Sequence, residues 1–167
     1  MALTEGNTGY KKQKMSLHTK LILFVATGFG LGRIPFAPGT FGTLGAIPLV
    51  WLMAGMSPGG IGFFLVSLIL VSVYVADQAE KIMGQKDPGS IVIDEIAGFC
   101  VTLSLVPVGW ISISLGFLVF RCFDVFKPGP VRYFEKNYSG GAGVVLDDIM
   151  AGVLAALVLK CLYWGFF

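Results

Sequence analysis

The sequence predicts an all-α membrane protein: a polytopic helical bundle in which some helices are short or re-entrant. Of its 167 residues, 55% are hydrophobic and only 13% are charged, and the mean hydropathy is +0.80. A soluble domain carries about 25% charged residues. Apolar runs alternate with turns that contain glycine and proline, and the last run approaches the roughly 20 residues that a helix needs to cross a bilayer. The length leaves room for one compact domain.

The first 20 residues are polar and basic, and we expect them to form a tail at the cytoplasmic surface. The single integral-membrane domain is then assigned to residues 21–167. No cleavage site of the A-x-A kind follows an apolar core, so the segment does not have the pattern of a signal peptide. The net charge of +2 is small, and nucleic acid is not an expected partner.

Residues 21–32 are apolar but short, and we expect a helix or re-entrant piece that ends near the membrane surface. Two prolines and two glycines follow within 33–43, which predicts an irregular loop there. Thr40 and Thr43 lie at the end of this loop, where the amides of a helix start could bind an anion. An ordinary capped loop is the alternative interpretation.

Three further apolar regions complete the predicted bundle. Residues 44–56 form the first clear span, and residues 61–76 return as the second after an uncharged turn. The run 96–120 is interrupted at 107–109 by proline and glycine, which favours a hairpin of two short helices over one kinked helix. Residues 149–167 form the last span.

Polar segments follow two of these regions. Asp77, Glu80 and Lys81 share one helical face at the end of the second span, and we interpret them as a solvated ion-pair cluster. Residues 131–139 are predicted to form a polar loop.

Two acidic pairs each precede an apolar run. Asp94-Glu95 introduces the hairpin, and Asp147-Asp148 follows a glycine-rich turn at 140–143. Burying unpaired carboxylates at the start of a membrane helix is costly. Capping of the helix N-terminus is one explanation, but a single Asp suffices for it. We therefore favour metal or phosphate chemistry.

Arg121, Asp124 and Lys127 are spaced at i, i+3 and i+6, which places them on one face of the last helical turn before Pro128. A cluster of basic side chains that reach the membrane interface is the alternative. That alternative does not account for Asp124 between the two bases.

The charge pattern places these residues at one membrane surface. The turns at 57–60 and 107–109 carry no charge, whereas the other connections are basic, and basic loops stay in the cytoplasm. The resulting topology gathers the following residues on the cytoplasmic side: Thr40, Asp94, Glu95, Arg121, Asp124, Lys127, Asp147 and Asp148.

Such a set predicts metal-assisted phosphoryl chemistry. Clustered carboxylates repel one another unless a cation lies among them, and ligation by oxygen without histidine suits Mg²⁺. The only histidine is His18, in the tail. Arginine and lysine beside the metal suit a phosphate, and the membrane setting makes a lipid the expected substrate.

Four segments of the sequence form longer motifs, which read P-x-A-P-G-T-x-G-T-L-x-A-x-P at 35–48, D-P-x-x-I-V-I-D-E-I-A-G at 87–98, F-R-x-F-D-x-x-K-P-x-P at 120–130 and G-G-x-G-V-V-L-D-D-x-x-A-G at 140–152. In this order they resemble the phosphatidylglycerophosphatase A family. The resemblance implies an all-helical, Mg²⁺-dependent phosphatase of the bacterial inner membrane. It implies hydrolysis of phosphatidylglycerophosphate to phosphatidylglycerol and phosphate, in phospholipid biosynthesis.

On this basis we expect catalytic and metal-binding roles for five carboxylates: Asp94, Asp147 and Asp148 first, then Glu95 and Asp124. We expect Arg121, Lys127 and Thr40 to bind the substrate phosphate. The expected partners are the lipid substrate and the surrounding membrane lipids, and the sequence does not predict the oligomeric state. The alternative is a non-enzymatic ion-binding protein or transporter, but transport sites usually lie near the membrane midplane.

Overall fold

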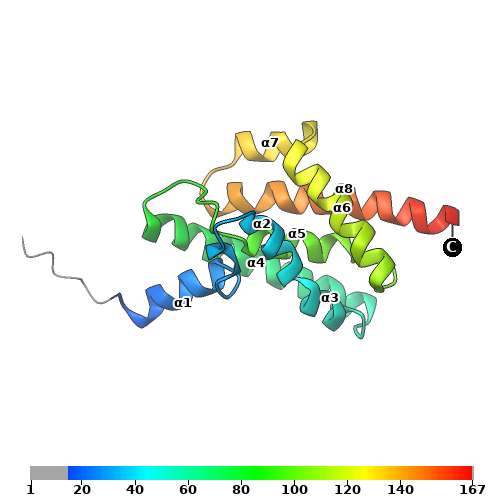
Figure 1. Cartoon of the computed structure of the whole chain (residues 1–167), viewed down its shortest axis with the longest axis horizontal. Coiled ribbons are helices and arrows are strands. Elements are labelled where there is room, and N and C mark those ends of the chain that lie inside the picture. Colours follow the sequence, from blue (N-terminus) through cyan, green and yellow to red (C-terminus); the bar gives the residue numbers. More distant parts are fainter. Residues whose placement is uncertain (1–14, 167) are drawn as a thin grey trace, which may run out of the picture.

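The structure, a computed structural model, describes residues 15–166, and every regular element in this range is a helix (Figure 1). The elements in chain order are α1 (Leu17–Ala26), a short 3₁₀ turn η1 (Leu31–Arg33), α2 (Pro38–Gly45), α3 (Ile47–Met53), α4 (Pro58–Met83), α5 (Ile93–Thr102), α6 (Trp110–Phe126), α7 (Gly129–Asn137) and α8 (Gly141–Phe166). Residues 1–14 of the predicted tail lie outside the described residues. Residues 17–20 are helical and belong to α1.

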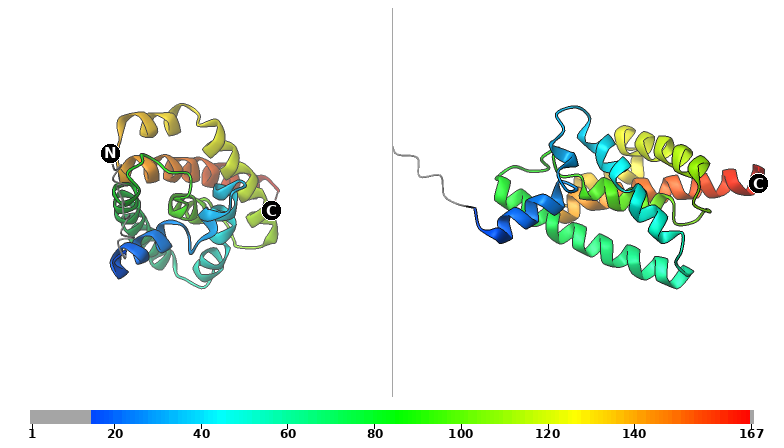
Figure 2. Two further views of the ribbon diagram at one scale, coloured as in Figure 1. Left: turned by 60° about the vertical axis from the view of Figure 1, so that its left-hand side comes forward. Right: turned by 60° about the horizontal axis from the view of Figure 1, so that its bottom comes forward.

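The short helix α5 forms the centre of the bundle. All of its residues are buried except Glu95, which is half-buried. Figure 2 (left) shows α5 in the middle, surrounded by the other helices. Its ten residues span about 15 Å, half of the roughly 30 Å hydrocarbon core of a bilayer. The acidic start of α5 is therefore inside the protein rather than at the end of a helix that crosses the membrane.

Glycines let α5 and α8 approach each other closely. A methyl group added to Gly98 would lie 2.6 Å from the carbonyl oxygen of Asp148, and one added to Gly152 would overlap the carbonyl oxygen of Gly98. Small residues at such crossings are typical of helices packed in membranes. Asp94 precedes Gly98 by one turn and Asp148 precedes Gly152 by one turn, so the same crossing brings the two carboxylates together.

The helices α4 and α8 are long and apolar enough to cross a membrane. The most apolar 18-residue stretch of α4 is only 17% buried, and its exposed side chains include Phe63, Val66 and Leu70. A soluble monomer rarely exposes an apolar strip of this size. The helix predicted over 61–76 is confirmed; it continues to Met83 and is a candidate membrane span.

Two predictions around residues 33–56 are wrong. The irregular loop ends at Ala37, because Pro38 takes the first helical position of α2, where its missing N–H costs nothing. The expected span 44–56 is instead divided at Ala46 between α2 and α3. Together these two helices cover 16 residues, or about 24 Å, which is too short to cross the hydrocarbon core.

Among the predictions for residues 96–152, one is confirmed and two are corrected. The hairpin with its turn near 107–109 is confirmed, since α5 and α6 are separate helices. Most of residues 131–139 belong to the helix α7, of which Val131 is a buried residue, so the prediction of a loop is wrong. The glycine-rich turn is reduced to Gly140, whose φ is 65°, and α8 begins at Gly141.

Candidate metal and phosphate site

Three helices and one loop meet around a polar cavity of about 180 Å³. The start of α5, the end of α6, the second turn of α8 and the α4–α5 loop each contribute side chains. The cavity is lined by all five predicted carboxylates and by Lys127, and the full set is Asp87, Gly89, Ile91, Asp94, Glu95, Asp124, Lys127, Val144, Asp147 and Asp148. The convergence predicted for these residues from the sequence is therefore present in the fold.

Asp94, Glu95 and Asp148 form the closest group. Each offers a carboxylate oxygen, and these oxygens all lie within 4.8 Å of one another. Asp94 and Asp148 are buried, and the Oε2 atom of Glu95 is buried without a hydrogen-bond partner. A buried acceptor without a partner is costly, and three carboxylates at this separation repel one another. A hard divalent cation with oxygen ligands removes both costs, so these three residues fit Mg²⁺.

The pKa values of the two carboxyl groups in α5 reflect the same crowding. Burial raises the pKa of Asp94 well above its ordinary value, and the charges of Glu95 and Asp148 raise it further. Burial also raises the pKa of Glu95. Bound metal would therefore compete with protons for these carboxylates.

Arg121 lies at the border between α6 and α2. Its guanidinium forms an ion pair with Asp124, one turn further along α6. A methyl group added to Gly39 would overlap Oε1 of Glu95 and would lie 3.1 Å from Nη1 of Arg121. The start of α2 thus forms a wall of the site. Thr40, the next residue, is half-buried and is not among the residues that line the cavity.

Lys127 pairs with Asp147, which is not a member of the three-carboxylate group. Its Nζ lies 2.7 Å from Oδ2 of Asp147 and 3.0 Å from Oε1 of Glu135 in α7. Burial alone would lower the pKa of Lys127, but hydrogen bonds to Asp147 and Glu135 outweigh it and raise the pKa above its ordinary value. Lys127 therefore remains a cation at the edge of the cavity.

Helix capping does not explain the second acidic pair. Asp147 and Asp148 are the seventh and eighth residues of α8. The unpaired N–H groups of a helix belong to its first four residues, which here are 141–144. The capping alternative is therefore wrong for this pair.

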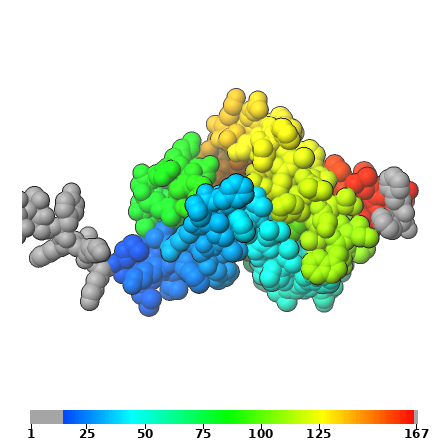
Figure 3. Space-filling view, viewed as in Figure 1, coloured from blue at the N-terminus to red at the C-terminus, as the bar shows by residue number. Residues whose placement is uncertain are grey.

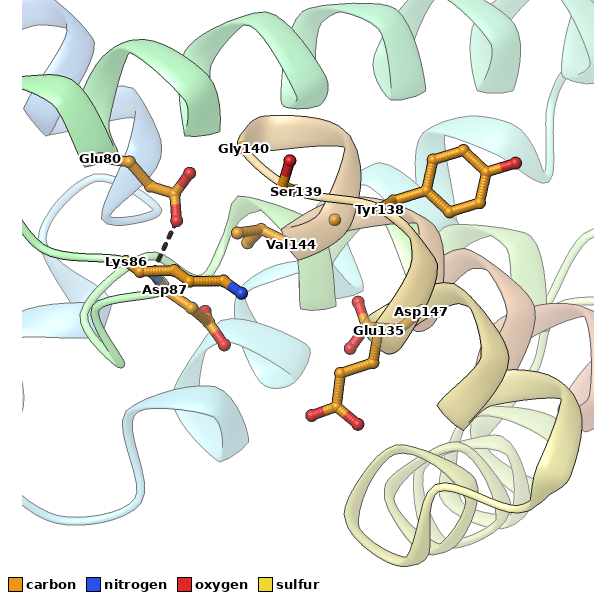
Figure 4. Close-up of a pocket in the computed structure, with 10 residues that line it drawn as sticks. Glu80, Lys86, Asp87, Glu135, Tyr138, Ser139, Gly140, Val144 and Asp147 are labelled. Carbon is orange, nitrogen blue, oxygen red and sulfur yellow. Dashed lines mark hydrogen bonds between the residues drawn. The ribbon is translucent and has the colours of Figure 1, made fainter.

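The structure adds Glu80 and Asp87 to the predicted residues. A second cavity, of about 110 Å³, shares Asp87, Val144 and Asp147 with the first (Figure 4). The backbone N–H of Asp87 donates to Oε1 of Glu80 at 2.6 Å, and Asp87 has a left-handed φ of 45°. Glu80 is buried toward this loop and does not join the surface pair of Asp77 and Lys81. In the sequence, Asp87 begins the segment 87–98 that resembles the family, whereas no sequence feature distinguished Glu80 from a solvated residue.

Sequence comparison identifies a family and several relatives of this chain. A family profile described as phosphatidylglycerophosphatase A matches residues 24–163. The phosphatidylglycerophosphatase A of Escherichia coli is 44% identical over 137 residues, which cover 81% of this chain and 79% of that protein. The phosphatidylglycerophosphatase A of Haemophilus influenzae is 35% identical over 167 residues, which cover 97% of this chain and 99% of that protein.

A further relative carries a different name. A Bacteroides thetaiotaomicron protein, named as a candidate phosphatidylinositol-3-phosphatase, is 34% identical over 154 residues, which cover 86% of this chain and 94% of that protein. No solved structure matches the chain.

Proposed function

The chain belongs to the phosphatidylglycerophosphatase A family and is a phosphatase, and from this premise we propose a Mg²⁺-dependent hydrolysis of phosphatidylglycerophosphate to phosphatidylglycerol and phosphate. The observation that carries the metal part is the group formed by Asp94, Glu95 and Asp148, with its buried and unpartnered oxygen. The family name supports the substrate.

Bound Mg²⁺ would polarise the phosphate and activate a water molecule. Asp94, Glu95 and Asp148 would hold the ion. Arg121 and Lys127 would bind phosphate oxygens by charge-assisted hydrogen bonds.

Other acidic residues keep these two cations in position. Asp124 pairs with Arg121, and Asp147 and Glu135 pair with Lys127. Thr40 and the amides at the start of α2 remain further proposed phosphate contacts, because Gly39 adjoins Glu95 and Arg121.

We place the site at the cytoplasmic face of the bacterial inner membrane. The end of α4 and the starts of α5 and α8 lie toward one end of the bundle in Figure 1, and the uncharged turns lie toward the other. The connections at the charged end carry the lysines and arginines, and such loops remain in the cytoplasm.

The test is phosphate release by the purified protein from phosphatidylglycerophosphate, with Mg²⁺ or with EDTA. We expect release that EDTA abolishes and that added Mg²⁺ restores. Release that is unaffected by chelation would refute the metal role. No release from this lipid, together with release from phosphatidylinositol 3-phosphate, would reassign the substrate to the one in the name of the Bacteroides relative.

A further inference from the structure

An apolar groove of about 390 Å³ lies beside the charged cavity. The helices α2, α3 and α6 form its sides, and Phe99 of α5 contributes to its lining. Ser114 is the one lining residue with a polar side chain apart from the indole of Trp110. Figure 3 shows α3 and α6 meeting on this face of the molecule.

On each of three helices, α2, α5 and α6, a residue that lines the groove lies four positions from a residue of the charged site. Leu44 follows Thr40 by four residues, and Phe99 follows Glu95 by the same interval. Phe117 precedes Arg121 by four residues. Residues four apart lie on the same helical face and about 6 Å apart along the axis. On each helix, therefore, the groove begins one turn from a residue assigned to metal or phosphate binding.

The two ends of the groove differ in character. At the charged end, Gly39 of α2 packs against Glu95 and Arg121, and α2 continues from there to Leu44, which lines the groove. At the far end, Trp51 of α3 and Trp110 of α6 meet edge to face with ring centroids 5.8 Å apart. From Phe117 to Trp110 is about 10 Å along α6. The groove is thus a slot with a charged end and an aromatic end.

We propose that this groove binds one acyl chain of the phospholipid substrate and directs its headgroup to Arg121 and the carboxylates. The inference rests on the proposed function, because it takes the substrate to be a lipid phosphate. The occupant is identified by continuity: an apolar slot that ends at cationic and acidic groups matches a molecule with an apolar chain attached to a phosphate. A surface that only contacts bulk lipid would not require its apolar residues to lie one helical turn from the charged site.

The first test fills the groove. Ser114 is exposed within the groove, and Ser114→Trp should block it. Ser67→Trp, at a half-buried position on α4 that does not line the groove, is the matched control. Each variant is assayed with diacyl phosphatidylglycerophosphate and with its deacylated, water-soluble counterpart, glycerophosphoglycerophosphate.

We expect Ser114→Trp to reduce kcat/KM for the diacyl substrate at least tenfold, mainly through KM, and to change kcat/KM for the deacylated substrate less than twofold. Ser67→Trp should leave both values unchanged. An undiminished kcat/KM for the diacyl substrate in Ser114→Trp would overturn the proposal. Equal losses with both substrates would overturn it too, because they would indicate a distorted site.

A binding measurement separates this proposal from the proposed function. Phosphatidylglycerophosphate with a photoreactive acyl chain should crosslink to Leu44, Phe117 or Trp110 in the wild-type protein. Excess unlabelled phosphatidylglycerophosphate should suppress the crosslink, and excess phosphatidylcholine should not. Equal suppression by both lipids would mean only a lipid-exposed surface. The crosslink supports or refutes the groove even if the wild type hydrolyses neither substrate, which would itself refute the proposed function.

Discussion

The two acidic pairs look alike in sequence and behave differently in the fold. Both Asp94 and Glu95 join the three-carboxylate group. The second pair divides: Asp148 joins that group, while Asp147 binds Lys127 at 2.7 Å. Neighbouring helical residues point about 100° apart, so a pair can serve two sites. The comparison teaches that the packing partner of each carboxylate, rather than the adjacent-acid pattern, determines its role.

The largest effect is expected at the shared group. Asp94→Asn and Asp148→Asn should each reduce activity about a hundredfold or more, a loss of about 2.7 kcal/mol of transition-state stabilisation, because Asn lacks the charge that holds a hard cation. Phosphate release over a range of Mg²⁺ concentrations measures this, and partial rescue at high Mg²⁺ is expected. Asp77→Asn, which removes the charge that pairs with Lys81 and lies outside the three-carboxylate group, is the control and should remain active. Full activity in either cluster variant would exclude that residue as a ligand.

The close packing of α5 against α8 can be disrupted without changing a charged residue. Gly98→Ala would place a methyl group 2.6 Å from the carbonyl oxygen of Asp148 and should push α5 and α8 apart. We expect a loss of about 1–3 kcal/mol in stability, with a loss of activity. Thermal unfolding in detergent measures the loss of stability, and phosphate release measures the loss of activity. Gly62→Ala in α4 is the matched control, since nothing lies within 4 Å of its added methyl group. Equal melting temperatures for Gly98→Ala and the wild type would show that the crossing tolerates a methyl group.

A smaller effect should separate Asp147 from Asp148. Asp147→Asn leaves Lys127 with Glu135 as its acidic partner. We expect about a tenfold loss of kcat/KM, equivalent to about 1.4 kcal/mol, mainly through KM. High Mg²⁺ should not rescue it, because the defect lies in phosphate binding. If Asp147→Asn is rescued by Mg²⁺ as Asp148→Asn is, both members of the pair bind metal and do not have separate roles.

The smallest expected effect is on the pH dependence of stability. Burial, together with Glu95 and Asp148, raises the pKa of Asp94 above its ordinary 3.8, so the folded protein binds this proton more tightly than the unfolded chain. The stability of the metal-free protein should therefore fall as pH rises from about 3.8 through the raised pKa. Mg²⁺ should stabilise more at the higher pH, because it replaces the proton. Melting temperatures in EDTA and in Mg²⁺ across this range measure both trends, and Asp94→Asn should flatten them.

The sequence predicted much of the site because charge patterning constrains topology. Uncharged turns and basic connections sufficed to bring Asp94, Asp124 and Asp148 together. Local rules failed where tertiary contacts decided the outcome. Pro38 was expected to prevent a helix and instead begins one. Glu80 shares a helical face with a solvated pair, but it is the α4–α5 loop that buries it.

The position of the groove bears on how a lipid reaches the catalytic centre. Transferring an acyl chain from an apolar environment to water costs about 0.8 kcal/mol per methylene group. For a dozen methylenes this is about 10 kcal/mol, which alone would slow a reaction by roughly seven orders of magnitude. With its chain in a slot one helical turn from Arg121, a lipid can present its phosphate while its tail remains in apolar surroundings. Desorption from the bilayer is then no part of the activation barrier.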